Sequence, residues 1–206
     1  MGELGLRHVE HGFGPVWDAG SRILVLGSMP SPKSREAAFY YMHPRNRFWP
    51  VLEQVLSDPA DPLDVAGVTA ESRRTFALRH HVALWDVIAS CDIAGASDAS
   101  IRNPVPNDLT AILDGATIGR ILTTGMTAAR LYRRLIALRL AAAGFDVPMT
   151  PLPSTSPANA RMGLDALVAA YRKAFANAPT DSVVGRFPDT PTRPTTSGLD
   201  AAPSAA

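Results

Sequence analysis

Residues 22–31 read RILVLGSMPS, a short apolar run that ends at Gly27 and passes into a loop of small residues and proline. A run of this length bounded by glycine is typical of a buried strand. Three similar runs follow, at 81–87 (HVALWDV), 120–124 (RILTT) and 147–152 (VPMTPL). Apolar residues spaced three or four apart predict helices at 48–56, 70–79, 108–113, 127–142 and 164–176. This alternation predicts an α/β fold with a parallel sheet covered by helices on both faces.

Size and charge predict one domain with a tail. The chain has 206 residues, 46% of them hydrophobic, and a formal net charge of +1. Residues 179–206 are dominated by Pro, Thr, Ser, Ala and Gly without an apolar period. We therefore predict a folded domain at 1–178 and a disordered tail at 179–206. The charge is too balanced to indicate nucleic-acid or membrane binding, so any polyanion-binding surface must be local.

Several classes of protein are excluded by what the chain lacks. No run approaches the roughly 18 to 20 apolar residues of a membrane span, and the N-terminal residues lack the apolar core of a signal peptide. We therefore expect a cytoplasmic, nucleoid-associated protein that does not bind membranes. The single cysteine, Cys91, cannot form an internal disulfide or a four-cysteine iron–sulfur cluster. The five histidines show no metal-ligand spacing, so we expect no metal.

Ligands of parallel sheets bind beyond the carboxyl ends of the strands, so the segments there are candidate site walls. The loop Gly27, Ser28, Met29 and Pro30 could bring its backbone close to a phosphate or a base, or could be a plain turn. Asp86 ends the second run, where a carboxylate could read a base edge or serve a structural role. The loop at 153–161 could contact sugar and phosphate, or be a capped turn.

Residues 39–49 (FYYMHPRNRFW) interleave aromatic rings with His and Arg. That mixture is typical of a wall that stacks bases and contacts phosphates, with Phe39 and Tyr40 as stacking candidates. The alternative is that Phe48 and Trp49 belong to the core of the following helix. Asn46 could be the N-cap of that helix or a catalytic residue, and the local sequence does not decide between them.

Three stretches together resemble the hypoxanthine-DNA glycosylase branch of the uracil-DNA glycosylase superfamily. They are LGSMPSPKSREAAFYYMHPRNRFW at 26–49, ALWDVIASCDIAGASDASIRNPVPND at 83–108 and LPSTSPANA at 152–160. The resemblance implies a three-layer α/β/α sandwich with a four-stranded parallel sheet. It also implies a monofunctional enzyme without cofactors, which hydrolyses the N-glycosidic bond of a deaminated base in DNA during base excision repair.

The resemblance also assigns roles to residues. Better-known branches carry Asp or Asn where this chain has Met29, and a His where it has Ser154. In the hypoxanthine branch an Asn in the HPxNxFW element has the catalytic role, and it matches Asn46. Asp86 falls near the position of a base-reading Asn, and Gly27, Ser28, Met29, Pro30, Phe39 and Tyr40 would complete the base pocket. The residues expected to contact DNA are Ser154, Thr155, Ser156, Pro157 and Asn159.

Other functions remain compatible with these motifs. The same fold could act mainly on uracil or another mispaired base, and the departures at Met29 and Ser154 are compatible with a non-catalytic module that binds lesions. An enzyme of small molecules with a similar sheet is a third alternative. The expected partner is DNA containing a deaminated base, and the expected state is a monomer.

Overall fold

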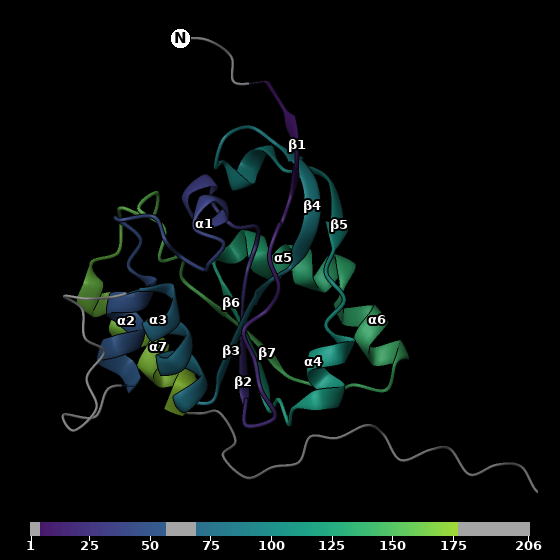
Figure 1. Ribbon diagram of the computed structural model, residues 1–206, viewed down its shortest axis with the longest axis vertical. Coiled ribbons are helices and arrows are strands. Elements are labelled where there is room, and N and C mark those ends of the chain that lie inside the picture. Colours follow the sequence, from purple (N-terminus) through teal and green to yellow (C-terminus); the bar gives the residue numbers. More distant parts are fainter. Residues whose placement is uncertain (1–4, 57–68, 177–206) are drawn as a thin grey trace, which may run out of the picture.

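The computed structural model describes residues 5–56 and 69–176 and has a four-stranded parallel sheet at its centre (Figure 1). The strand order is β3-β2-β6-β7, and all neighbours are parallel. The strands are β2 (Ile23–Gly27), β3 (Val82–Asp86), β6 (Arg120–Thr124) and β7 (Met149–Leu152). All four predicted strands and the predicted fold class are therefore confirmed.

Helices cover both faces of the sheet and complete the three layers (Figure 1). β2 is buried along its whole length, and its side chains alternate between two cores. Ile23 and Val25 pack in one core, whereas Leu24 and Leu26 pack in the other, as a fully covered strand requires. One face carries α2 (Phe48–Leu56), α3 (Ala70–Arg79) and α7 (Leu164–Ala176), and the other α4 (Thr110–Gly115), α5 (Met126–Leu135) and α6 (Ala137–Ala142).

The helix predicted at 127–142 is two helices, so that prediction was wrong in its continuity. α5 and α6 are separated by Ile136, whose ψ of −46° is helical but whose φ of −117° is not. Ile136 is 2% exposed and lies in the same core as Leu140. The non-helical φ of Ile136 thus ends α5, and both side chains are buried in that core.

A second, antiparallel sheet was missed. Its order is β1-β4-β5, formed by β1 (Arg7–Glu10), β4 (Ile88–Ile93) and β5 (Arg102–Pro106). No strand was predicted at residues 88–93, yet β4 follows β3 with only Val87 between them. β1 is largely exposed and lacks the apolar alternation that predicts a strand. β5 holds two prolines, which argue against a strand.

Two short helices complete the described chain, α1 (Pro32–Glu36) after β2 and η1 (Asp98–Ser100) between β4 and β5. No helix among residues 5–56 and 69–176 is long and apolar enough to cross a membrane. In the same ranges, no three His, Cys, Asp or Glu side chains are grouped so that they could hold a metal ion. The tail predicted at 179–206 lies outside the described residues.

Candidate active site

The carboxyl ends of the four parallel strands meet at one edge of the sheet and bring the predicted segments together. Gly27 at the end of β2 is in register with Asp86 at the end of β3, and Thr124 of β6 is in register with Leu152 of β7. The loop after β7 reaches β6, since a Cβ placed on Gly125 would lie 3.2 Å from the Cβ of Ser154. The site is therefore described from this edge.

Gly27 and Asp86 approach each other so closely that only glycine fits at position 27. A Cβ on Gly27 would lie 2.2 Å from Oδ1 of Asp86, well inside any contact distance. Asp86 is 3% exposed, although it carries a carboxyl group and ends an apolar strand. The close approach of the Gly27 backbone in this structure is to a carboxylate oxygen of the protein itself, and an approach of the loop to a phosphate or a base stays a prediction.

His11 holds that carboxylate, and the sequence reasoning missed it. Nε2 of His11 lies 2.8 Å from Oδ2 of Asp86, and both side chains are 5% exposed. A buried carboxylate needs such a partner, because an unpaired one is strongly destabilising. The position of Asp86 at the end of an apolar run indicated that its carboxylate needs a partner. Nothing in the sequence indicated that this partner lies 75 positions away.

The junction between β3 and β4 is fixed by four hydrogen bonds around Val87. Its N–H donates to the carbonyl of Gly27 at 2.9 Å, and the N–H of Ile88 donates to that of Ser28 at 3.1 Å. Asn107 bonds both sides of the junction, through its N–H to Val87 (2.9 Å) and through Nδ2 to the carbonyl of Asp86 (2.9 Å). The loop after β2 is thereby joined to both sheets.

Ser28 also has a partner that the sequence reasoning missed. Its hydroxyl donates to Oδ2 of Asp98, on η1, at 2.7 Å. Asp98 is exposed as a residue, but its carboxyl group is turned onto the buried hydroxyl of Ser28. Burial raises the pKa of the Asp98 carboxyl, the Ser28 hydrogen bond opposes that rise, and the charge of Asp86 adds to it.

Met29 and Pro30 are buried rather than open to a ligand. Met29 is 9% exposed and packs in the core on the α4–α6 side with Leu24 and Leu26. A thioether in that position offers only a weak acceptor, so it cannot replace the Asp or Asn that the resemblance places there. A polar group from another segment is needed for that role.

The aromatic stretch is mainly core, in contrast to the open stacking wall expected for it. Phe39 and Tyr40 are each 2% exposed. The ring of Phe39 stacks on Trp49 at 6.0 Å, and the hydroxyl of Tyr40 donates to the carbonyl of Gly14 at 2.8 Å. Phe48 and Trp49 are buried too, as the alternative interpretation held. Stacking on Phe39 or Tyr40 would require their surroundings to open, and it stays a prediction.

Tyr41 is the aromatic residue of this stretch that reaches the carboxyl edge. Its hydroxyl and that of Thr124 lie 3.2 Å apart, and its ring stacks on Phe48 at 3.8 Å. Its φ of +56° lies in the left-handed region, where a bulky side chain is strained. Burial of the hydroxyl raises the pKa of Tyr41 well above its usual value, so it is a neutral hydrogen-bonding group.

Asn46 caps α2 and keeps unused hydrogen-bonding capacity. Its Oδ1 accepts the N–H of Phe48 at 2.9 Å, which is the capping role considered above. Within the described residues, Nδ2 of Asn46 has no hydrogen-bond partner, and the side chain is half-buried. The cap therefore does not exhaust the amide, and a catalytic role stays a prediction.

Arg47 points inward and fixes the loop after β7. Its guanidinium donates to three backbone carbonyls, those of Met162, Ser156 (3.0 Å) and Asn159 (2.8 Å). Its own N–H donates to the carbonyl of Thr155 at 3.1 Å. Arg47 therefore holds the loop after β7 in place, which we call the Arg47 clamp. It does not make the phosphate contact that its place among aromatic residues suggested.

Some polar groups of the loop after β7 hydrogen-bond within the loop itself. Oγ of Ser154 accepts the N–H of Ser156 at 3.2 Å, and Nδ2 of Asn159 donates to the carbonyl of Ser154 at 2.8 Å. Thr155 is 1% exposed, whereas Ser156 and Pro157 are half-buried. Without DNA, the loop is therefore the capped turn considered in the sequence analysis. DNA contacts stay predictions for Ser154, Thr155, Ser156, Pro157 and Asn159.

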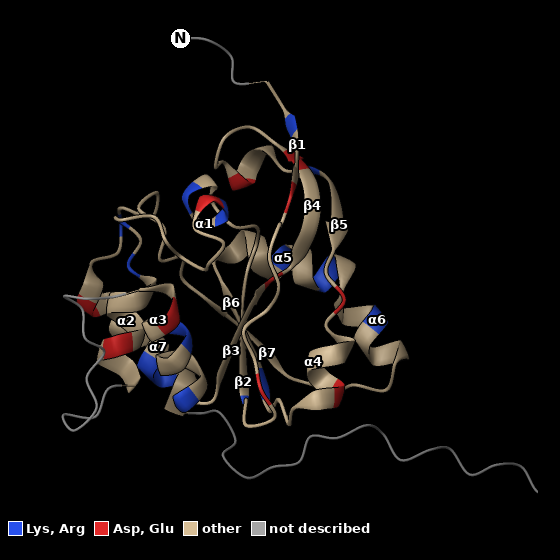
Figure 2. Cartoon of the chain, in the orientation of Figure 1, with Lys and Arg blue, Asp and Glu red and all other residues tan. Residues whose placement is uncertain are grey.

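Basic and acidic side chains lie side by side on α1, which begins at Pro32, two residues after Pro30 (Figure 2). Lys33 is paired with Glu36 at 2.7 Å, and Arg35 donates to the carbonyl of Pro30. Arg45 and Arg161 are exposed on the segments that Arg47 joins. The exposed positive charge near this edge thus comes from a few side chains. A balanced net charge predicts such a local arrangement for any polyanion-binding surface.

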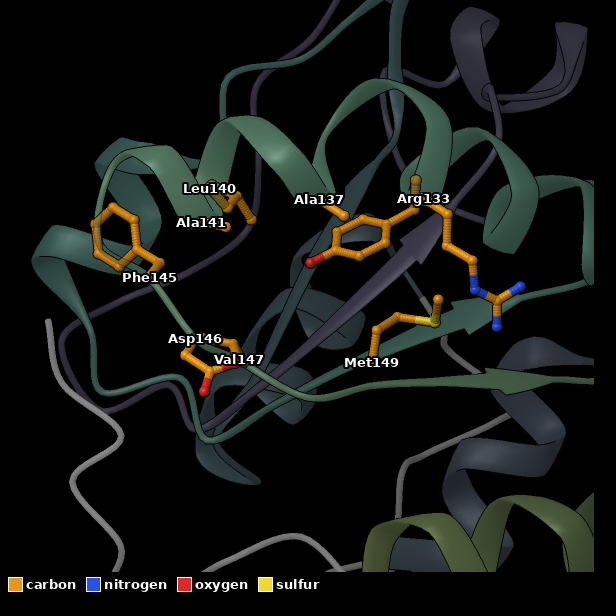
Figure 3. A pocket seen from close by; sticks show the side chains of 9 residues that line it. Arg133, Ala137, Leu140, Ala141, Phe145, Asp146, Val147 and Met149 are labelled. Atoms are coloured by element: carbon orange, nitrogen blue, oxygen red, sulfur yellow. The ribbon is translucent and has the colours of Figure 1, made fainter. Parts of the chain in front are cut away.

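A cavity of about 290 Å³ lies away from this edge, between α5–α6 and the chain entering β7 (Figure 3). Its lining includes Tyr132, Arg133, Leu140, Phe145 and Met149. None of these residues follows a strand at its carboxyl end, and none was predicted as a site residue. The cavity is separate from the candidate active site.

A sequence model of the uracil DNA glycosylase superfamily matches residues 14–177. This chain belongs to that superfamily. The match includes every predicted site residue from Gly27 to Asn159, so it applies to the edge described above. His11 lies just before the matched range.

Two curated proteins are similar to the chain. A protein of Methanosarcina barkeri named "Hypoxanthine DNA glycosylase" is 31% identical over 107 residues, which are 52% of this chain and 65% of the relative. A protein of the same name from Methanosarcina acetivorans is 28% identical over 154 residues, covering 74% of this chain and 90% of the relative. The chain thus spans less than two thirds of the first relative.

The fold of the superfamily is also found among solved structures. A solution NMR structure of a candidate uracil DNA glycosylase from Methanosarcina acetivorans aligns with a TM-score of 0.62 and 26% sequence identity. The alignment covers 81% of this chain and 98% of that one. The chain therefore matches the uracil DNA glycosylase superfamily both by sequence and by fold.

Proposed function

We propose that this glycosylase excises hypoxanthine from DNA by hydrolysing its N-glycosidic bond and leaving an abasic site. The observation that carries the proposal is the name shared by both curated relatives, together with the Asn46 element that the hypoxanthine branch uses. A duplex-bound base is reached by flipping it out of the stack. Flipping is least costly for a poorly paired base, and deaminated adenine is one.

Asn46 would orient the attacking water. An amide has no useful basicity, so it cannot take a proton as a carboxylate would. Orientation suffices if the bond to the sugar is largely broken before attack, since an oxocarbenium-like sugar reacts with neutral water. The second lone pair of Oδ1 and the unpartnered Nδ2 are the groups available for this water.

The departing base carries developing negative charge, which backbone amides of the loop at Ser28 and Met29 would stabilise. The loop is a fixed donor array, because hydrogen bonds from Val87 and Ile88 hold its carbonyls. Preorganised donors act at the moment of bond breaking without further reorganisation. Ser154 and Ser156 would contact the flanking backbone from the loop that Arg47 clamps.

Uracil is the second candidate substrate, and the NMR neighbour described as a candidate uracil DNA glycosylase favours it. Against it stand Met29 and Ser154, which replace the Asp or Asn and the His of the better-known branches. The role in base excision repair follows from either substrate, because both lesions arise by deamination.

The test is cleavage, after alkali treatment, of end-labelled duplexes with one hypoxanthine, uracil or xanthine. We expect wild-type protein to nick the hypoxanthine duplex and a folded Asn46→Ala variant to bind it without nicking. Activity on uracil alone would move the proposal to the second substrate. Binding of lesion DNA without any abasic site would identify a non-catalytic module and overturn the proposal.

A further inference from the structure

We propose that His11 is a positioning residue for Asp86, and that the pair selects bases that carry a ring N–H beside a carbonyl. The inference rests on the glycosylase function proposed above and extends it to the chemistry of base selection. His11 precedes the range matched by the superfamily model, so its role is inferred from its contacts alone.

The His11 ring is fixed on several sides. Nε2 of His11 lies 2.8 Å from Oδ2 of Asp86, and since a carboxylate only accepts, the ring N–H donates. The ring of Phe13 lies 4.4 Å from that of His11 and the ring of Tyr40 lies 6.0 Å away, by centroids. The backbone N–H of His11 donates to the carbonyl of Ala89 at 2.8 Å, which ties it to β4. The carboxylate is therefore held in one orientation.

The other oxygen of Asp86 is free to accept. Across residues 5–56 and 69–176, no group hydrogen-bonds Oδ1, which faces the backbone of Gly27 at the carboxyl edge. Because Gly27 lacks a side chain, Oδ1 can lie against its backbone, where a Cβ would be only 2.2 Å away. A single fixed acceptor at a strand end is suited to reading one donor of a base.

The pair is not arranged for stability alone. Nδ1 of His11 is buried, and among the described residues nothing hydrogen-bonds it. A buried polar atom without a partner is unfavourable, and such atoms in folded proteins call for an explanation. Holding Asp86 in its orientation provides that explanation, since an apolar residue at both positions would avoid the penalty.

The chemistry of deamination defines the selection. Deamination turns an amino group beside a ring-nitrogen acceptor into a carbonyl beside a ring N–H. Hypoxanthine, xanthine and uracil carry this N–H, which Oδ1 of Asp86 can accept. Adenine and cytosine present a nitrogen lone pair there, which a carboxylate oxygen repels. Guanine and thymine also carry the N–H, so the pair selects against adenine and cytosine only.

The test is single-turnover excision of hypoxanthine by variants of both residues. We expect His11→Ala to lower kcat/KM about 100-fold, the effect of misplacing a reacting group by about 1 Å. His11→Gln should restore most of the activity, because its amide N–H can replace Nε2–H. In an Asp86→Asn background, His11→Ala should have little further effect, since a residue acting through Asp86 is not additive with it.

His8→Ala is the matched control, because His8 lies on the adjoining strand, is exposed and bonds Asp92 instead. It should leave excision unchanged. If His11→Ala does not fold, as melting would reveal, His11→Asn replaces it, because its amide is too short to reach Oδ2. Wild-type activity in a folded His11→Ala or His11→Asn variant, equal loss in His11→Gln, or additive losses would overturn the inference and leave the proposed function intact.

A binding measurement separates the two proposals. Duplexes with 2′-fluoro sugars resist cleavage, and the ratio of Kd values for hypoxanthine and adenine duplexes reports selection without chemistry. We expect wild-type protein to prefer hypoxanthine at least 10-fold and His11→Ala to lose that preference. If wild-type protein excises nothing but prefers the hypoxanthine duplex, and His11→Ala loses that preference, the proposed function fails and the inference holds. No wild-type preference overturns the inference whatever the activity.

Discussion

Replacing Asn46 separates its capping role from its proposed catalytic role. Asn46→Ala removes the 2.9 Å hydrogen bond from Oδ1 to the N–H of Phe48 at the start of α2. Loss of such a cap costs about 1 kcal/mol of stability. For a domain of this size, that lowers Tm by about 2–4 °C. Asn46→Ser keeps an oxygen that can accept the same N–H, so its Tm should stay within about 1 °C of wild type.

The two variants should nevertheless lose the same activity. A serine hydroxyl ends short of the position where the amide would meet water, so both variants should excise hypoxanthine at least 100-fold more slowly. That loss corresponds to about 3 kcal/mol of transition-state stabilisation. The assay is single-turnover excision with excess enzyme, beside a melting curve and a binding isotherm for the uncleaved duplex. Binding should change less than about threefold.

The outcome that refutes this reasoning is specific. If Asn46→Ser excises hypoxanthine at the wild-type rate while Asn46→Ala does not, the residue serves the reaction only by capping α2. If both variants retain wild-type rates, another group positions the water and the Asn46 assignment is wrong.

Three further predictions follow from the contacts at the edge. Gly27→Ala should lower excision about 100-fold, because its Cβ would lie 2.2 Å from Oδ1 of Asp86 and force that oxygen to move; kcat/KM of the folded variant checks this. Arg47→Met should cost about 3 kcal/mol in urea unfolding and raise KM, because it releases three carbonyls; unchanged stability and KM would refute the clamp. Burial raises the pKa of the Asp98 carboxyl above its value in the unfolded chain. The free energy of unfolding should therefore fall as pH rises from about 4 through the raised pKa. Asp98→Asn should flatten that fall, as urea midpoints between pH 4 and 7 would show.

The parallel sheet and its helices could be predicted from the sequence, because each buried strand is an apolar run with a clear end. The antiparallel sheet could not. β4 is the most buried strand of this sheet, but its pattern does not alternate, because the neighbours Ser90 and Cys91 are both buried. It also follows β3 after one residue, without a turn signal. Prolines in β5 further argued against a strand, although they are tolerated at the edge of a sheet.

The candidate site was predictable where the motif is local and not where partners are distant. Gly27, Asp86 and Asn46 each stand at the end or start of an element, and their positions followed from that. His11 and Asp98 lie in segments without an apolar period, and their partners are 75 and 70 positions away in the chain. Arg47 was recognised only as a cation among aromatic residues, because nothing local shows that its guanidinium turns inward.

The single-residue junction at Val87 has a mechanical consequence. Strands of two sheets meet there without a loop, and hydrogen bonds from Val87, Ile88 and Asn107 brace the joint. A wall built in this way has no hinge of its own, so its shape is set before DNA arrives. Under the proposed function, the DNA would then deform on binding, whereas the conformational entropy of this wall is already lost when the protein folds.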